Sequence, residues 1–226
     1  MAAAEPAGPP AAPLELALET SRRPGSLAVA LGGRVESAAL ADGRAHASDL
    51  LPLLERKLAE LGIPRRDGTL SIARVFVGTG PGSYTGLRVG LATAQGLCRG
   101  TGAGLVGVCS FEALARSALA PGDEGAVVLD ARAGRFYHAR YRRTEEDVAT
   151  VFAPEVLTVS ELRERLALPG PILGHTGLAE SAGLSDALVR RMRTDLAPEA
   201  AQLFALGRSR APRPPEPMYL RDFGER

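Results

Sequence analysis

The chain has 226 residues, of which 45% are hydrophobic, and its formal net charge is +1. This length suffices for one large core or two smaller ones, and the near-neutral charge gives no reason to expect direct binding of nucleic acid. Arginine clusters at 190–193 and 208–213 are interpreted as solvated faces. No apolar run approaches the eighteen or more residues that span a bilayer. Cys98 and Cys109 fit neither a disulfide framework nor a CxxC pair, which favours a reducing compartment. From these two observations we expect a cytoplasmic protein without a membrane anchor.

The first elements are a tail and a meander of strands. Residues 1–13 are rich in Ala and Pro and lack the basic and apolar regions of a signal peptide, so a disordered tail is expected. Three strands separated by turn signals are then predicted at Leu14–Glu19, Ser26–Leu31 and Arg34–Leu40.

Residues 45–61 are expected to form an amphipathic helix. Its apolar positions recur at spacings of three and four, and Gly62 and Pro64 end it. These positions are Leu50, Leu53, Leu54, Leu58 and Leu61. A strand at Arg74–Val77 then leads into the most specific feature of the chain.

That feature is the run GTGPGSYTGLRVG at Gly78–Gly90, with five glycines in thirteen residues. Glycine permits positive φ and close approach of another segment, so we expect a tight loop that opens a helix from about Tyr84 to Cys98. A loop of this kind can hold an anion. The phosphate-loop lysine is missing, which argues against a Walker-type NTPase. The loop residues of interest are Gly80, Gly82, Ser83, Thr85, Gly86 and Arg88.

Small residues mark one face of the helix after this loop. Gly86, Gly90 and Ala94 stand four apart, so another helix or strand can approach closely there. The close approach could serve packing within the monomer or packing against another subunit, and the sequence leaves both open.

The second half of the chain repeats the plan of the first. An apolar strand that closes on an acid, followed by a hairpin return, occurs at 14–31 and again at 125–141. Two similar lobes around a cleft are therefore expected, at 14–104 and a smaller one at 105–210, before a Pro-rich segment at 211–226. The other predicted elements are a strand at 105–108, a helix at 111–119, a helix at 160–168 with Ser160 as N-cap, a strand at 171–173 and a helix at 198–208.

Glu19 and Asp130 would face each other across this cleft, where paired carboxylates suit a metal–nucleotide. In the actin-like and sugar-kinase plan, however, each acid is followed two residues on by glycine, whereas Glu19 precedes Thr20-Ser21 and Asp130 precedes Ala131-Arg132. We interpret the pair as a degenerate nucleotide site whose acids cap turns. The three histidines are too scattered for a metal site, and Ser83 is a poor match to a nucleophile elbow. We expect no catalytic residue and no metal ligand.

The segments at 16–21, 44–52, 80–90, 130–132 and 217–221 together resemble the TsaB family of bacterial tRNA threonylcarbamoyladenosine biosynthesis proteins. The resemblance implies an α/β, actin-like (ASKHA, ribonuclease H-like) fold with two lobes and duplicated mixed sheets flanked by helices. It implies a non-catalytic cytoplasmic subunit that binds a TsaD-like catalytic subunit and a TsaE-like ATPase. The joint reaction transfers threonylcarbamoyl to the adenosine beside the anticodon of tRNAs that read codons beginning with A. ATP or ADP and a metal would belong to the partners, and tRNA would be met only through the complex.

The resemblance also assigns roles to particular positions. The catalytic relative carries an HxxxH metal motif where this chain has Ser110 and Leu114, and neither side chain replaces imidazole. The helices of the first lobe form the family's subunit interface, which implies partner contacts by His46, Leu50, Leu53, Leu54, Gly86, Gly90 and Ala94. Glu19 departs from the aspartate usual in the family. An independent actin-like nucleotide-binding enzyme and a self-associating homodimer remain as alternatives.

Overall fold

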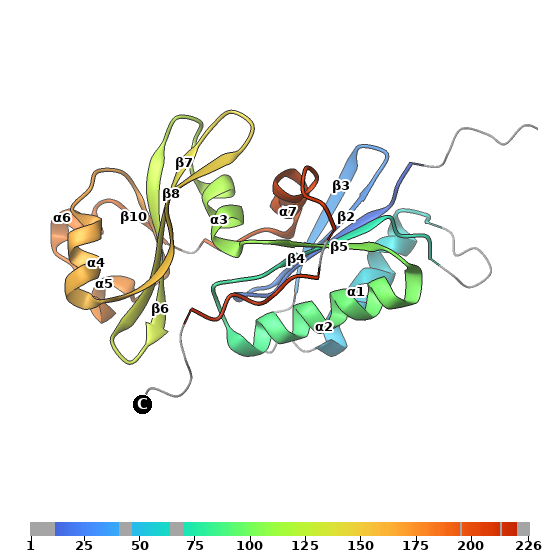
Figure 1. Cartoon of the computed structure of the whole chain (residues 1–226), viewed down its shortest axis with the longest axis horizontal. Helices are drawn as coiled ribbons and strands as arrows, with labels where there is room; N and C mark the ends of the chain where they lie inside the picture. The colour runs from blue at the N-terminus through green and yellow to red at the C-terminus, as the bar shows by residue number, and fades with distance from the viewer. Residues whose placement is uncertain (1–11, 41–46, 64–69, 195, 213, 221–226) are drawn as a thin grey trace, which may run out of the picture.

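The computed structural model describes residues 12–40, 47–63, 70–194, 196–212 and 214–220. It contains two five-stranded mixed sheets that lie side by side along the long axis of the molecule, each flanked by helices (Figure 1). Within the described ranges, every helix is too short or too polar to cross a bilayer. The expected tail falls almost wholly outside these ranges, and so does His46.

The first sheet has the strand order β3-β2-β1-β4-β5. Its central strand β1 pairs antiparallel with β2 and parallel with β4, and the long helix α2 connects β4 to β5. Gly102 ends α2 in the left-handed conformation, with φ of 74°. The elements of this half are β1 (Glu15–Glu19), β2 (Ser26–Leu31), β3 (Arg34–Ala39), α1 (Ala47–Glu60), β4 (Arg74–Gly78), α2 (Tyr84–Thr101) and β5 (Gly104–Val108).

The second sheet has the order β10-β9-β6-β7-β8. Strand β6 pairs antiparallel with β7 and parallel with β9, which is the arrangement of β1 in the first sheet and confirms the predicted repeat. The remaining elements are α3 (Ser110–Ala118), β6 (Glu124–Arg132), β7 (Arg135–Arg143), β8 (Val148–Thr158), α4 (Val159–Leu166), β9 (Ile172–Leu173), α5 (Leu178–Ser181), α6 (Asp186–Val189), β10 (Met192–Arg193) and α7 (Ala200–Gly207).

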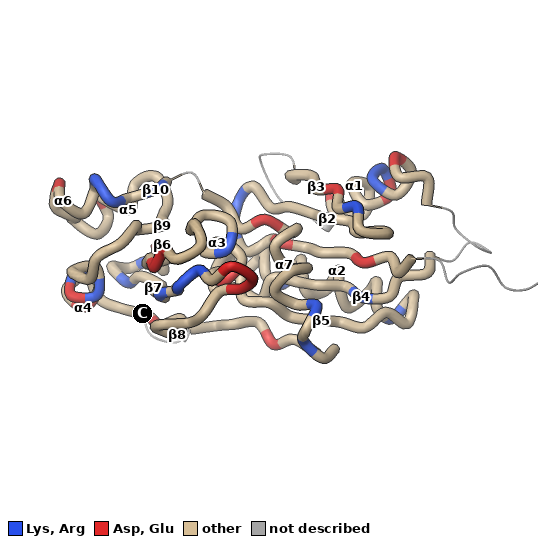
Figure 2. The backbone as a smooth tube through the Cα atoms, turned by 90° about the horizontal axis from the view of Figure 1, so that it is seen from above, with Lys and Arg blue, Asp and Glu red and all other residues tan. Residues whose placement is uncertain are grey.

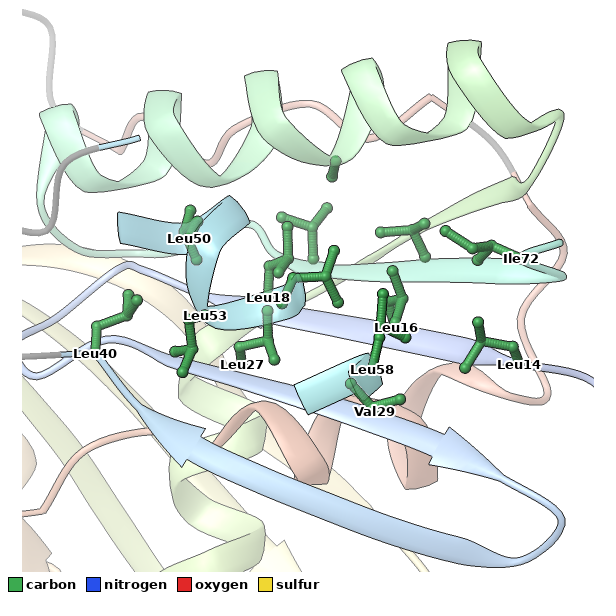
Figure 3. Close-up of a cluster of buried hydrophobic side chains, with 14 of the residues drawn as sticks. Leu14, Leu16, Leu18, Leu27, Val29, Leu40, Leu50, Leu53, Leu58 and Ile72 are labelled. Carbon is green, nitrogen blue, oxygen red and sulfur yellow. The ribbon is translucent and has the colours of Figure 1, made fainter. Parts of the chain in front are cut away.

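Helices cover both faces of the first sheet, and because successive strand side chains point to opposite faces, alternate residues pack against different helices. Leu16, Leu18 and Leu27 pack against the leucines of α1, as Figure 3 shows for Leu50, Leu53 and their neighbours. Alternate residues of the same strands meet α7 on the other face, where Phe76 packs edge-to-face on Phe204 with ring centroids 5.4 Å apart.

The helices α3 and α7 lie where the two lobes meet (Figure 1). Phe111 and Leu114 of α3 are buried against the second sheet, whereas Ala113 of the same helix packs with α7 and the first sheet. A buried carboxylate fixes the end of α7, because Glu15 of β1 accepts hydrogen bonds from Arg74 and Arg208. Charged residues of both signs are spread over both lobes (Figure 2).

The predicted division of the chain differs from the structure in two respects. Strand β5 pairs with β4 and so belongs to the first sheet, which moves the boundary beyond residue 108. Helix α7, placed by sequence in the second lobe, packs on strands of the first sheet. The second lobe therefore contains neither β5 nor α7, and its five-stranded sheet is built from β6 to β10.

Two local predictions also need correction. Ser160 is not the N-cap of α4: Thr158 takes this position and forms a reciprocal capping box with Glu161. Strand β8 was not predicted, because it is an edge strand with mostly exposed or half-buried side chains and contains Pro154.

Candidate functional site

A cleft of about 760 Å³ lies between the two lobes. It is formed by the turn after β1, the start of α2, the β6–β7 turn and the residues after β9. Its lining includes Ser21, Arg22, Arg23, Gly82, Ser83, Tyr84, Thr85, Asp130, Arg132, Tyr137, His175 and Thr176. The structure thus brings part of the glycine run and Asp130 to one cleft, a juxtaposition that was not predicted from the sequence.

The glycine run is shaped by contact with the end of β1. A Cβ on Gly82 would lie 2.3 Å from the carbonyl oxygen of Ser21, and Ser83 N–H donates a hydrogen bond of 2.7 Å to that same oxygen. Gly80 has φ of 94°, which favours glycine. Ser83 then caps α2 by accepting a hydrogen bond from Gly86 N–H. The predicted tight loop that opens a helix is confirmed.

The residues of this loop divide between the cleft and its surroundings. Gly82, Ser83 and Thr85 line the cleft, whereas Gly80 and Gly86 are buried beside it. Arg88 lies outside the cleft: its guanidinium sits 3.9 Å from the ring centroid of Tyr84 and donates to the Tyr219 hydroxyl at 3.4 Å. Arg88 therefore joins α2 to the C-terminal segment.

The two acids have different environments. Glu19 exposes 1% of its surface and does not line the cleft; its Oε1 accepts a 2.7 Å hydrogen bond from Ser21 N–H, and its Oε2 has no partner. Burial raises the pKa of the Glu19 carboxyl, and hydrogen bonding with Ser21 opposes this only in part. Asp130 lines the cleft, where it accepts a 2.6 Å hydrogen bond from Arg132 N–H. The expected pairing of these acids across a cleft does not occur.

The residues assigned to a partner interface are largely internal. Leu50, Leu53 and Leu54 are buried in the core between α1 and the first sheet (Figure 3). Gly86, Gly90 and Ala94 are buried as well. A Cβ on Gly90 would lie 2.2 Å from Thr20 Oγ1, so this small-residue face packs against the end of β1. The interface assignment is wrong for these six residues, because their surfaces are covered within the monomer.

Ser110 and Leu114, which stand where the catalytic relative has its HxxxH histidines, stabilise the loop and the core of this chain. Ser110 Oγ accepts a 3.1 Å hydrogen bond from Gly80 N–H, and Leu114 is buried in the core of the second lobe. Among the described residues, no group of three or more His, Cys, Asp or Glu side chains could hold a metal ion.

Several cleft residues were not identified as site residues from the sequence, namely Arg22, Arg23, Arg132, Tyr137, His175 and Thr176. The signal that could have found the arginines is their position, because Arg22 and Arg132 follow Glu19 and Asp130 in equivalent turns of the repeat. Tyr137 and the residues after β9 reach the cleft only through the sheet topology.

The duplicated sheets and the cleft between them define an actin-like protein of the ASKHA class. A family model described as TsaD, tRNA N6-adenosine threonylcarbamoyltransferase, matches residues 39–189. The tRNA threonylcarbamoyladenosine biosynthesis protein TsaB of Escherichia coli K12 is 31% identical over 224 residues, covering 92% of this chain and 94% of that protein. The chain belongs to the TsaB family.

Two further comparisons agree with this assignment. An uncharacterized protein of Mycobacterium tuberculosis is 34% identical over 193 residues, and the match covers 85% of this chain and 81% of the mycobacterial protein. The structure of YeaZ from Pseudomonas aeruginosa superimposes with a TM-score of 0.68 at 26% identity, covering 86% of this chain and 90% of that one.

Proposed function

We propose that this protein is a non-catalytic subunit in the biosynthesis of tRNA threonylcarbamoyladenosine, required by a TsaD-like catalytic subunit for threonylcarbamoyl transfer. The observation that carries the proposal is the 31% identity to a TsaB protein over 92% of the chain. In this role the chain works in the cytoplasm with a TsaE-like ATPase. ATP or ADP and the metal bind to the partner subunits, and tRNA is met only through the complex.

The chemistry of the described residues supports a role without catalysis. Asp130 is held by Arg132, and Glu19 is enclosed behind Ser21, so neither is placed as a metal ligand. Ser110 and Leu114 serve the loop and the core instead of a metal.

The outer faces of α1 and α2 are better candidates for partner contact than the buried faces. Leu51 of α1 is 47% exposed although its neighbour Leu50 is buried. On α2 a shallow groove of about 360 Å³ is lined by Tyr84, Thr85, Arg88, Val89, Ala92 and Thr93. Exposed apolar surface of this kind supports binding of another subunit.

Reconstitution tests the function directly. The TsaD-like and TsaE-like proteins, ATP, threonylcarbamoyl donor and tRNA are combined with and without this chain, and the modified nucleoside is measured by mass spectrometry. We expect product only when the chain is present. Equal product without it would overturn the proposal.

A matched pair of substitutions tests the surface. Ala92→Arg places a bulky charge in the α2 groove, and Ala149→Arg places the same charge on the exposed edge strand β8. We expect Ala92→Arg to abolish co-elution with the TsaD-like subunit on size-exclusion chromatography, while Ala149→Arg retains it. The reverse result would locate the interface elsewhere, and a stable homodimer that excludes the partner would favour the self-associating alternative.

The second candidate function is that of an independent nucleotide-dependent enzyme. The cleft between the lobes is the one specific observation that supports it. This alternative requires that the isolated chain hydrolyse ATP in the presence of Mg²⁺. It also requires that Glu19→Ala and Asp130→Ala both abolish turnover. We expect no turnover by the isolated chain.

A further inference from the structure

The segment that follows α7 runs back along the first lobe toward its junction with the second lobe (Figure 1, red). The structure describes residues 208–212 and 214–220 of this segment. Near its start, Arg210 forms a 2.7 Å ion pair with Glu112 of α3. The described residues that come after Arg210 form no helix or strand, so contacts of individual residues hold them in place.

Two prolines of this segment pack on β5, the edge strand of the first sheet. A Cβ on Gly104 would lie 2.9 Å from Pro212 Cγ, and a Cβ on Gly107 would lie 2.5 Å from Pro215 Cβ. Gly104 and Gly107 are three positions apart in β5, so they face opposite sides of the sheet and the segment passes around its edge. Because proline has no N–H to donate, these residues cover the edge without extending the sheet.

Met218 contacts both lobes. Its N–H donates a 2.8 Å hydrogen bond to the carbonyl oxygen of Thr79, the residue that follows β4 in the first lobe. Its side chain is partly buried against the apolar cluster of the second lobe, which includes Leu129 of β6 and Leu173 of β9. The backbone of Met218 is therefore bound to one lobe and its side chain to the other, so a change in the angle between the lobes would separate these contacts.

The next residue, Tyr219, lies on the outer face of α2. Its ring centroid is 5.2 Å from that of Tyr84, and its hydroxyl accepts a 3.4 Å hydrogen bond from Arg88 Nε. The Arg88 guanidinium lies 3.9 Å from the centroid of the Tyr84 ring, so the three side chains form one cluster. Tyr219 is nevertheless 41% exposed, so this anchor can be released without disturbing a core.

We propose that residues 210–212 and 214–219 form a strap that restrains the angle between the lobes, with Tyr219 as its releasable latch. The Cα atoms of Met218 and Tyr219 are about 3.8 Å apart, so one residue cannot move far without the other. While Tyr219 lies on α2, Met218 stays in the cluster of the second lobe. Release of Tyr219 frees Met218 as well, and the lobes are then held by their remaining contacts through α3.

The position of the latch connects the outer face of α2 to the junction of the lobes. Tyr84 and Arg88, which hold Tyr219, also line the shallow groove on α2. Occupation of that groove therefore competes with the latch. All contacts of the strap lie within the chain, so the proposal does not depend on the proposed function and is tested without a partner.

Distances between the lobes in the isolated full chain test the strap. Spin labels are attached at Ser37→Cys on β3 and Ser160→Cys on α4, two exposed positions in different lobes. The background carries Cys98→Ser, and Cys109 is buried. Double electron–electron resonance then gives the distribution of distances between the two labels.

We expect Tyr219→Ala and Met218→Ala each to broaden this distribution, because either change opens the link between the lobes. Arg88→Ala should broaden it as well, since the guanidinium joins Tyr219 to α2. Hydrogen exchange gives a second measurement: in Tyr219→Ala the Met218 amide should lose protection, because its hydrogen bond to Thr79 opens more often.

Two further variants serve as controls. Glu216→Ala changes an exposed side chain of the same segment and should leave the distribution unchanged. Met218→Leu keeps an apolar side chain in the cluster of the second lobe and should retain the narrow distribution. Circular dichroism confirms that each variant is folded.

An unchanged distribution in both Tyr219→Ala and Met218→Ala would overturn the proposal. Broadening in only one of these two variants would also overturn it, because the latch and the interlobe contact would then act separately. Equal broadening in Glu216→Ala would show that the effect is not specific to the latch and would count against it in the same way. Tyr219 is largely outside the core, so Tyr219→Ala does not depend on how well the core tolerates substitution.

Discussion

Thr20 and Gly86 are in direct contact although 66 positions separate them: Thr20 Oγ1 donates a 2.8 Å hydrogen bond to the Gly86 carbonyl. A Cβ on Gly86 would lie 2.0 Å from the Thr20 carbonyl oxygen. The end of β1 and the first turn of α2 therefore touch backbone to backbone. This contact sets the position of the helix whose N-terminus faces the cleft.

Gly86→Ala should accordingly destabilise the protein by about 1–3 kcal/mol, because the obstructing atom is backbone and cannot move aside alone. Gly96→Ala is the matched control in the same helix, since nothing lies within 4 Å of a Cβ there. That control should be neutral or stabilising by up to about 1 kcal/mol. Urea unfolding followed by circular dichroism measures both, and equal effects would contradict the packing account.

Leu50 and Leu51 are neighbours with opposite environments, which separates core from surface in α1. Leu50→Ala should cost about 2–5 kcal/mol, because it leaves a cavity in the core between α1 and the first sheet. Leu51→Ala, at a side chain that is 47% exposed, should change the free energy of unfolding by at most about 0.5 kcal/mol. The same unfolding assay distinguishes them, and a large effect at Leu51 would show that it is covered in the monomer.

Apolar periodicity and turn residues are local signals, and they predicted many of the strands and helices and the repeat that suggested two lobes. The actin-like fold class was implied by the resemblance to the TsaB family. The strand Ser26–Leu31 has the predicted bounds. The predicted repeat of the hairpins is confirmed because β1 pairs antiparallel with β2 in the first sheet, as β6 does with β7 in the second. The predictions that were wrong concern residues whose packing partners lie far away in the sequence. The Gly86 and Gly90 face was recognised as a packing face, but the sequence could not show that Thr20 fills it.

The same limit applies to the cleft. Asp130 was predicted there from the repeat, whereas Tyr137 and His175 arrive through strands paired far along the chain. Helix α7 was assigned to the wrong lobe because its apolar pattern does not specify which sheet it covers. For α7 and for these cleft residues, long-range topology was the missing information.

Glu15 anchors α7 through two guanidinium groups, and its removal should loosen the first lobe. Its carboxylate accepts from Arg74 Nη2 at 2.6 Å and from Arg208 Nε at 2.8 Å. Glu15→Ala should destabilise by about 1–3 kcal/mol, below the cost of a fully buried pair because both arginines are partly exposed. Glu36→Ala breaks the exposed pair with Arg34 and should cost at most about 0.5 kcal/mol. Indistinguishable thermal unfolding of the two variants would argue against the anchor.

His138 should make stability fall at mildly acidic pH. Burial lowers the pKa of this imidazole below 6.5, against the opposing effect of Glu155, and Arg165 and Arg140 lower it further. The unfolded chain therefore binds the proton more readily, so the contribution is complete above pH 6.5 and is lost as the pH falls toward the folded pKa.

Comparison with His138→Gln isolates this effect. Wild type should lose stability relative to the variant by at most about 1.4 kcal/mol per pH unit below pH 6.5. Hydrogen bonds from Arg165 and His138 outweigh burial and lower the pKa of Glu155, so its loss falls below pH 4.5, in a separate range. Parallel stability curves for the two proteins between pH 7 and 5 would rule out His138 as the cause.

Glu19 should have the opposite dependence on pH. Burial raises the pKa of its carboxyl above 4.5, so the folded state binds this proton more tightly than the unfolded chain. Its contribution is therefore most favourable below pH 4.5 and is lost as the pH rises through the folded pKa. Glu19→Gln removes the titration and retains an acceptor for Ser21 N–H. The stability of the variant relative to wild type should increase above pH 4.5 and then level off, as measured by urea unfolding from pH 4.5 to 8. A constant difference for Glu19→Gln over this range would refute the buried-carboxyl account.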